Sequence, residues 1–200
     1  DHLDVAAETM HGLFTCPVIG TGTGWGHNTH GECDTPMPNT DFLVLSAGGF
    51  HSLGLKINGS ILAWGDRRYG QADVPAPSAG YQAVGGGWYH SLGLKADRSI
   101  MAWGNNEFGA CNVPAPNAGF LAVAAGSEHC VGRKADGSIA AWGANGSRQC
   151  DVPAPNSDFV GVAAGERARR CWEIIEHPPE GFVRAGSPFF EFFLLEGYQR

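Results

Sequence analysis

The chain has 200 residues, of which 43% are hydrophobic, 16% are charged and 30 are glycines, a composition typical of a globular protein with many tight turns. Its net charge of −7 at pH 7 argues against nucleic acid as a partner, because binding to phosphates needs a basic surface. No apolar run approaches the length of a membrane span, and the first ten residues lack the basic start and apolar core of a signal peptide. We therefore expect no membrane partner, and the compartment stays open.

A Trp-Gly pair recurs along the chain at one fixed spacing. The pairs begin at Trp25, Trp64, Trp103 and Trp142, and 64 − 25 = 103 − 64 = 142 − 103 = 39. A constant spacing over four copies indicates a repeat architecture, in which each unit covers its apolar face with its neighbours. We predict one array over residues 1–165, with copies at 1–38, 39–77, 78–116 and 117–155 and a partial copy at 156–165.

The first copy diverges from the others. Its glycine-rich stretch 20–24 lacks the Gly-Lys-Ser/Thr ending and the following helix of a nucleotide-binding phosphate loop. His27, His30 and Cys33, with Cys16 nearby, are ligand types that zinc accepts, but no second ligand pair at a zinc-site spacing follows. We interpret this region as a solvated loop and expect neither a metal nor a cofactor.

The three full copies each begin with a predicted β-hairpin. Each copy has an aromatic residue, at 42, 81 or 120, followed by a small apolar run. In the copy at 39–77, the next segment starts at His51 and alternates Leu53 and Leu55 with Ser52 and Gly54, which is a strand pattern. A turn follows at 58–59, 97–98 or 136–137, with sequence Asn-Gly, Asp-Arg or Asp-Gly. Such pairs favour a two-residue hairpin turn in which both residues have positive φ.

The rest of each copy is a second hairpin strand, Ser-Ile-x-Ala-Trp-Gly, a polar loop, and a segment that ends in Val-Pro. Because proline cannot donate to a strand ladder, this last segment fits an outermost strand that leads into the next unit. Each copy then has three or four antiparallel strands, which is the make-up of a propeller blade. The predicted fold class is all-β: a β-propeller or propeller-like array of about four to five 39-residue repeats.

Residues 166–200 depart from the repeat. Ala168 stands where the next repeated histidine is due, and neither a hairpin signal nor a Trp-Gly pair follows. Three interpretations compete: a capping segment, a partner of the first blade in ring closure, or sequence from a disrupted gene. Terminal repeats are commonly atypical, so we predict a separate C-terminal segment that acts as a cap or in closure.

The repeat resembles a known family. The motif Val-Ala-Ala-Gly-x-x-His-x-Leu-x-x-Lys-x-Asp-Gly-Ser-Ile-x-Ala-Trp-Gly-x-Asn-x-x-Gly-x-x-x-Val-Pro, assembled from residues 84–153, resembles the repeats of the regulator of chromosome condensation family. Its short spacing and Val-Pro ending are most similar to the bacterial branch that includes the propeller-type beta-lactamase inhibitory protein. The resemblance implies a β-propeller that acts as a non-enzymatic binding surface. The family also brings guanine-exchange activity into consideration, but no residue here indicates it.

The resemblance does not determine how many blades this chain forms. Members of the family commonly have seven blades, and 7 × 39 = 273 residues exceeds the 200 of this chain. The chain is then a small four- or five-bladed propeller, an open fragment, or a protomer completed by assembly.

The residues that repeat most strictly are interpreted as scaffold. Because His51, His90 and His129 recur at the period, we expect each ring to bond backbone at the start of a second strand. The repeated tryptophans are expected to pack between blades. Cysteines recur at 33, 111 and 150, too far apart on neighbouring units for disulfides, so we expect free thiols. Neither a Gly-x-Ser-x-Gly elbow nor a His-Glu-x-x-His motif is present, and we predict no enzyme activity.

Residues that differ between copies form the candidate site. Successive antiparallel strands reverse direction, so the turn between strands one and two and the loop after strand three emerge on the same face. These positions supply aromatic and arginine residues, the types that dominate protein interfaces. We predict a protein-binding site, with protein as the partner, that consists of Phe50, Arg67, Arg68, Tyr69, Trp88, Tyr89, Glu107 and Phe108.

Two alternatives remain for this face. A carbohydrate- or small-ligand-binding propeller with one site per blade predicts similar residues at equivalent loop positions, whereas Phe50, Tyr89 and Glu128 differ. A structural unit that joins copies of itself into a larger ring, as a homo-oligomer, is the other alternative.

Overall fold

The computed structural model describes residues 4–7, 11–16 and 20–165. These residues form four three-stranded antiparallel sheets, and none of them forms a helix long and apolar enough to cross a membrane. The strands are β1 (Asp4–Ala7), β2 (His11–Cys16), β3 (Thr21–Gly26), β4 (Phe42–Ala47), β5 (His51–Lys56), β6 (Ile61–Gly65), β7 (Tyr81–Gly86), β8 (His90–Lys95), β9 (Ile100–Gly104), β10 (Phe120–Ala125), β11 (His129–Lys134) and β12 (Ile139–Gly143).

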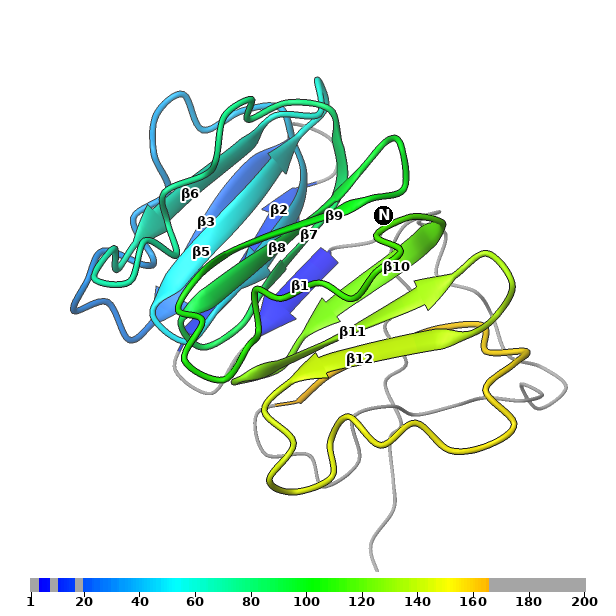
Figure 1. Cartoon of the computed structure of the whole chain (residues 1–200). Helices are drawn as coiled ribbons and strands as arrows, with labels where there is room; N and C mark the ends of the chain where they lie inside the picture. Colours follow the sequence, from blue (N-terminus) through cyan, green and yellow to red (C-terminus); the bar gives the residue numbers. More distant parts are fainter. Residues whose placement is uncertain (1–3, 8–10, 17–19, 166–200) are drawn as a thin grey trace, which may run out of the picture.

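The four sheets follow one another in chain order as an arc, from β1–β3 to β10–β12 (Figure 1). The first strands β1, β4, β7 and β10 contact one another from sheet to sheet, and each middle strand contacts the first strand of the next sheet. This packing confirms the predicted all-β array of propeller-type blades, with four copies seen as three-stranded sheets.

Both faces of strand β5 are covered, which explains why the strand contains a glycine, Gly54. All residues from His51 to Leu55 in β5 are buried, so the strand alternates between two packed faces and not between core and solvent. Gly54 is required there because a Cβ atom would lie 2.3 Å from the ring of Phe42. The ammonium of Lys56 lies 4.6 Å from the centroid of the same ring.

The hairpin turns differ from the prediction. Lys56 N donates to Ser60 O at 2.8 Å and Gly59 N donates to Lys56 O at 2.8 Å, which makes a three-residue loop over 57–59. Only the last loop residue has positive φ, at 77° for Gly59, 65° for Arg98 and 78° for Gly137. The prediction that both turn residues have positive φ is wrong, because a three-residue loop needs the left-handed conformation at its final position alone.

The segment ending in Val-Pro is not a strand, so each described blade has three strands. The amide side chain of Asn117 takes the place of a fourth strand: it accepts from Ile100 N at 2.7 Å and donates to Ile100 O at 2.8 Å. The same pair of bonds joins Asn39 to Gly22 and Asn156 to Ile139. One side chain thus pairs with both backbone groups of one residue on the outer edge of the third strand.

After β12 the repeat continues through the connection. Phe159 is buried and its N donates to Gly137 O at 3.0 Å, as Phe120 N does to Arg98 O. Residues 166–200, and with them Ala168, lie outside the described residues, so the cap or closure segment stays a prediction.

Candidate protein-binding edge

The variable loops lie at one edge of the array. The loop edge, as we use the name, consists of residues 27–35, 48–50, 66–73, 87–89, 105–112, 126–128 and 144–151. The turn edge consists of the hairpin loops 57–60, 96–99 and 135–138. Asp66 N donates to Phe50 O at 2.9 Å, and Asn105 N donates to Tyr89 O at 2.8 Å. These bonds join the loop after each third strand to the turn after the first strand, as the strand directions predict.

Aromatic rings from three copies gather at the loop edge. The rings of Phe50, Trp88 and Tyr89 lie nearly parallel, within 14°, with centroids 5.4 Å (Phe50 and Tyr89), 6.5 Å (Phe50 and Trp88) and 6.1 Å (Trp88 and Tyr89) apart. Tyr69 adds a tilted ring 5.1 Å from Tyr89, and its side chain is half exposed. Four of the eight predicted site residues therefore lie together as one group of aromatic rings.

Two histidines extend this cluster and were not among the predicted site residues. The ring centroids of His27 and His30 lie 6.1 and 5.6 Å from that of Phe50. The repeat contains the signal that could have found them: 69 − 30 = 39, so His30 holds the position of Tyr69 in the preceding copy. We use the name ring cluster for His27, His30, Phe50, Tyr69, Trp88 and Tyr89.

The scaffold fixes the position of Trp88. A Cβ atom on Gly49 would lie 1.8 Å from Cδ1 of Trp88, so the indole rests directly on the backbone of the preceding blade. The backbone of Trp88 is held as well, because its N donates to Ser127 O at 3.1 Å. The indole is thus part of an ordered surface before any partner arrives.

The two predicted arginines lie beside the cluster, and each has an acidic partner within the chain. Arg68 donates through Nε to both carboxylate oxygens of the buried Asp66 at 3.0 Å, and Arg67 contacts Asp73 at 2.8 Å. Burial raises the pKa of Asp66, but hydrogen bonds and charge attraction from Arg68 outweigh it and lower the pKa. Both positive charges are therefore compensated locally.

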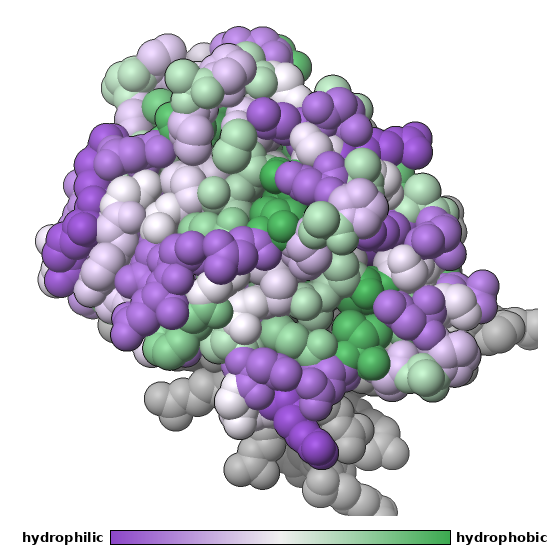
Figure 2. Space-filling view, viewed as in Figure 1, coloured by the Kyte–Doolittle hydropathy of each residue, from purple (hydrophilic) through white to green (hydrophobic). Residues whose placement is uncertain are grey.

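Glu107 and Phe108 lie on the loop edge outside the ring cluster. Phe108 holds the repeat position of Tyr69, but the position that carries the ring of Tyr89 in blade three carries Glu128 in blade four. The side chain of Phe108 is 49% exposed and has no neighbouring ring of this kind in the part of the chain that the structure describes. On the face of the molecule that Figure 2 presents, small hydrophobic patches are bounded by hydrophilic side chains.

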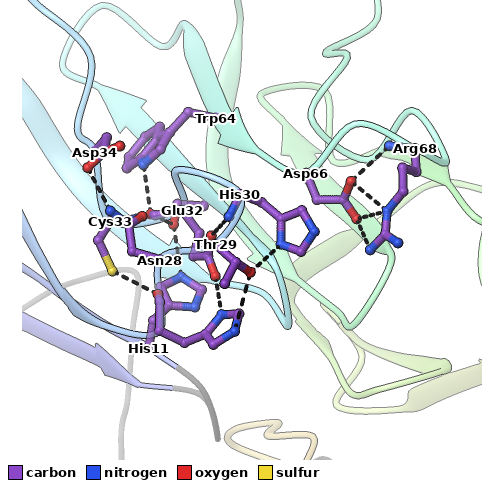
Figure 3. A network of polar contacts seen from close by, with 12 residues as sticks. His11, Asn28, Thr29, His30, Glu32, Cys33, Asp34, Trp64, Asp66 and Arg68 are labelled. Carbon is purple, nitrogen blue, oxygen red and sulfur yellow. Dashed lines mark hydrogen bonds and ion pairs between the residues drawn. The ribbon is translucent and has the colours of Figure 1, made fainter.

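A polar network holds the first-copy loop against the cluster (Figure 3). The carboxylate of Glu32 is fully buried and accepts from His30 N at 2.8 Å, while its other oxygen lies 2.5 Å from His27 Nδ1. Burial raises the pKa of Glu32, but hydrogen bonds from its own backbone, from His27 and from the backbone of His30 outweigh it and the pKa is lowered. Cys33 Sγ donates to His27 O at 3.2 Å. Across the described ranges, no three His, Cys, Asp or Glu side chains are arranged to hold a metal ion.

The repeated histidines bond the next blade, so the predicted bond to backbone is wrong. His51 Nε2 lies 2.8 Å from Ser91 Oγ, and that hydroxyl donates to Gln71 O at 2.8 Å. Trp103 Nε1 donates to the same carbonyl at 2.9 Å. Equivalent contacts join His11 to Ser52 and His90 to Cys130. His11, His51 and His90, like Trp64, Trp103 and Trp142, thus each join two blades. His129 Nε2 has no hydrogen-bond partner among the described residues.

Burial keeps these histidines neutral. Desolvation, with smaller contributions from neighbouring histidines, lowers the pKa of His51 to about 3 and that of His90 to about 4. The cysteines at 33, 111 and 150 are free, as is the buried Cys130, and burial raises the pKa of each thiol. Burial thus favours the neutral imidazole in the histidines and the protonated thiol in the cysteines.

Comparison with known families matches this repeat directly. The model of the regulator of chromosome condensation (RCC1) repeat matches residues 45–71, 81–110 and 120–149. These three segments of the chain are RCC1 repeats. Each match begins in the first strand of a blade and ends in its post-tryptophan loop, so it covers the scaffold and part of the loop edge.

Solved structures of similar shape have the same fold. Prp20p from Saccharomyces cerevisiae has a TM-score of 0.70 at 16% identity, with 82% of this chain and 54% of that chain covered. The CRINKLY WD40 ectodomain of the Arabidopsis thaliana receptor kinase ACR4 has a TM-score of 0.64 at 24% identity, covering 83% and 58%. The ectodomain of the Physcomitrella patens receptor kinase CR4 has a TM-score of 0.64 at 21% identity, covering 82% and 46%. The chain spans about half the length of these proteins.

No curated protein sequence matches the chain. The closer similarity to the bacterial short-repeat branch therefore stays a prediction.

Proposed function

We propose that these RCC1 repeats form a protein-binding module whose recognition surface is the loop edge and which carries out no chemistry of its own. The ring cluster carries this proposal. Its rings occupy loop positions that the repeat leaves variable, and Trp, Tyr and Phe supply much of the binding energy in protein interfaces. Because Trp88 is already seated on Gly49, binding would order few side chains and cost little entropy.

A protein of the same fold gives support from outside the chain. Prp20p has binding properties to Gsp1p and histones, and a further structure shows Kap60 bound to it. At 16% identity the likeness concerns the fold, so these partners are not assigned to this chain. They are an example of RCC1-type propellers in protein recognition.

The proposal is tested with a purified partner. Partners captured on the wild-type protein are identified, purified and measured by calorimetry against a Trp88→Ala/Tyr89→Ala variant whose fold is checked by thermal unfolding. We expect at least a 30-fold loss of affinity, since two central aromatic residues together are worth about 2 kcal/mol or more. Ile57→Ala, which truncates an exposed side chain on the turn edge, is the matched control and should leave affinity unchanged. An affinity of the double variant within twofold of wild type would refute this placement.

A further inference from the structure

Charge is distributed unevenly between the two edges of the array. The loop edge carries three arginines and seven acidic residues, so its net charge is 3 − 7 = −4 with histidines neutral, out of −7 for the whole chain. The three arginines each have an ion pair with an aspartate: Arg67 with Asp73, Arg68 with Asp66 and Arg148 with Asp151. The negative charge of this edge is therefore not neutralised by the arginines beside it.

The lysines of the sheets do not offset this charge, because they lie toward the turn edge. Lys56, Lys95 and Lys134 end the middle strands where the hairpin loops begin. Their ammonium groups lie 4.6, 5.8 and 5.2 Å from the ring centroids of the aromatic residues that open each blade. A ring that carries a cation on its face is thus a contact this protein already uses.

The repeat places two of the loop-edge carboxylates beside the exposed ring of Phe108. Glu107 precedes it in the chain, and Glu128 holds the repeat position from which Tyr89 contacts Tyr69 and Phe50 contacts His30. Both glutamates are exposed, and neither has an ion pair with any residue the structure describes. An exposed aromatic face next to two uncompensated carboxylates is complementary to a cation.

We propose that Glu107, Phe108 and Glu128 receive a basic side chain, preferentially arginine, from the docking segment of the protein partner. This inference rests on the proposed function and adds the chemistry of the partner. A guanidinium group is planar and weakly hydrated, so it can stack on the ring of Phe108 while its N–H groups donate to a carboxylate. The ring cluster then binds the apolar part of the same segment, and the acidic loop edge attracts it from a distance.

The test uses two peptides that differ only in charge. Acetyl-Ala-Arg-Ala-amide and the same peptide with neutral citrulline in place of arginine are titrated into the ¹⁵N-labelled protein and followed by NMR. We expect saturable shifts of the backbone amides of Glu107, Phe108 and Glu128 with the arginine peptide, and about tenfold weaker binding of the citrulline peptide, from an exposed cation–ring contact and exposed ion pairs.

Charge variants complete the test. Glu107→Gln/Glu128→Gln should reduce the affinity for the arginine peptide part of the way to that of the citrulline peptide, because the ion pairs are lost while the cation–ring contact with Phe108 remains. Asp41→Asn/Asp158→Asn removes the same two charges from exposed residues beside the turn edge and should leave binding unchanged; both positions have positive φ, which asparagine tolerates.

The inference is overturned by equal binding of the two peptides, by the absence of shifts at the three residues, or by an affinity for the arginine peptide that is unchanged in the glutamine variant. If the Trp88→Ala/Tyr89→Ala variant still loses its protein partner in any of these cases, the proposed function stands and only the basic-segment inference fails.

Discussion

Replacement of Ser91 by alanine tests how the blades are joined. The Ser91 hydroxyl is fully buried and donates its one hydrogen to Gln71 O at 2.8 Å. It can therefore only accept from His51, so the proton of that ring is on Nε2. The alanine variant keeps the histidine and removes the acceptor, which leaves a buried N–H donor without a partner.

The expected loss follows from this count of hydrogen bonds. An unsatisfied buried donor costs about 1–3 kcal/mol, whereas Gln71 O keeps its bond from Trp103 and loses only one of two donors. We expect the free energy of unfolding to fall by about 2 kcal/mol. Ser91→Cys should lose less than about 1 kcal/mol, because blade four already uses a thiol here: Cys130 Sγ lies 3.1 Å from His90 Nε2 and 3.4 Å from Ala110 O.

The assay is urea unfolding followed by circular dichroism, with amide hydrogen exchange of β5 and β8 to locate the effect. In the alanine variant, protection should fall in these two strands before it falls in the rest of the array, because blades interact with nearest neighbours. A loss below 0.5 kcal/mol for Ser91→Ala, or equal losses for alanine and cysteine, would show that the histidine contact does not stabilise the blade junction.

Three further predictions follow from single observations. The free energy of unfolding should fall as pH decreases from 6.5 toward 4, by up to about 1.4 kcal/mol per pH unit for each of His51 and His90. The reason is that these histidines take up protons in the unfolded chain at pH values where they stay neutral in the folded chain. Urea unfolding at several pH values measures this slope, and His90→Gln should reduce it. Arg98→Gly should raise the unfolding free energy by about 1 kcal/mol, since Arg98 has φ of 65° where the equivalent turns have glycine. Gly49→Ala should displace the Trp88 indole, reduce the near-ultraviolet circular dichroism and cost about 1–3 kcal/mol in thermal unfolding.

The repeat made the fold predictable because each blade presents the same local signals. Residues that recur every 39 positions, such as Trp64 and Gly59, predict the hairpins, the common edge of the variable loops and the packing role of the tryptophans. The third-strand edge was misassigned because a single amide, as in Asn117, can replace a strand, and sequence pattern alone does not distinguish the two.

The candidate site was predictable in part. Phe50, Trp88 and Tyr89 were found because they break the repeat while their surroundings keep it, and the structure stacks their rings. His27 and His30 were assigned to a solvated loop because their contact with Phe50 depends on the buried Glu32, whose position in space is set by the first blade and not by local sequence.

The amide side chains on the third strands have a consequence for solubility. An outer strand with free N–H and C=O groups is a template on which a strand of another molecule can pair, and arrays of similar blades offer many such edges. Asn39, Asn117 and Asn156 occupy this template with a bond in each direction, at residues 22, 100 and 139. In blade two the backbone of Ser78 accepts from Ile61 N instead. The connections between blades thus block strand pairing at one residue of each of these edges, and Asn117→Ala would free the backbone groups of Ile100 for pairing with another chain.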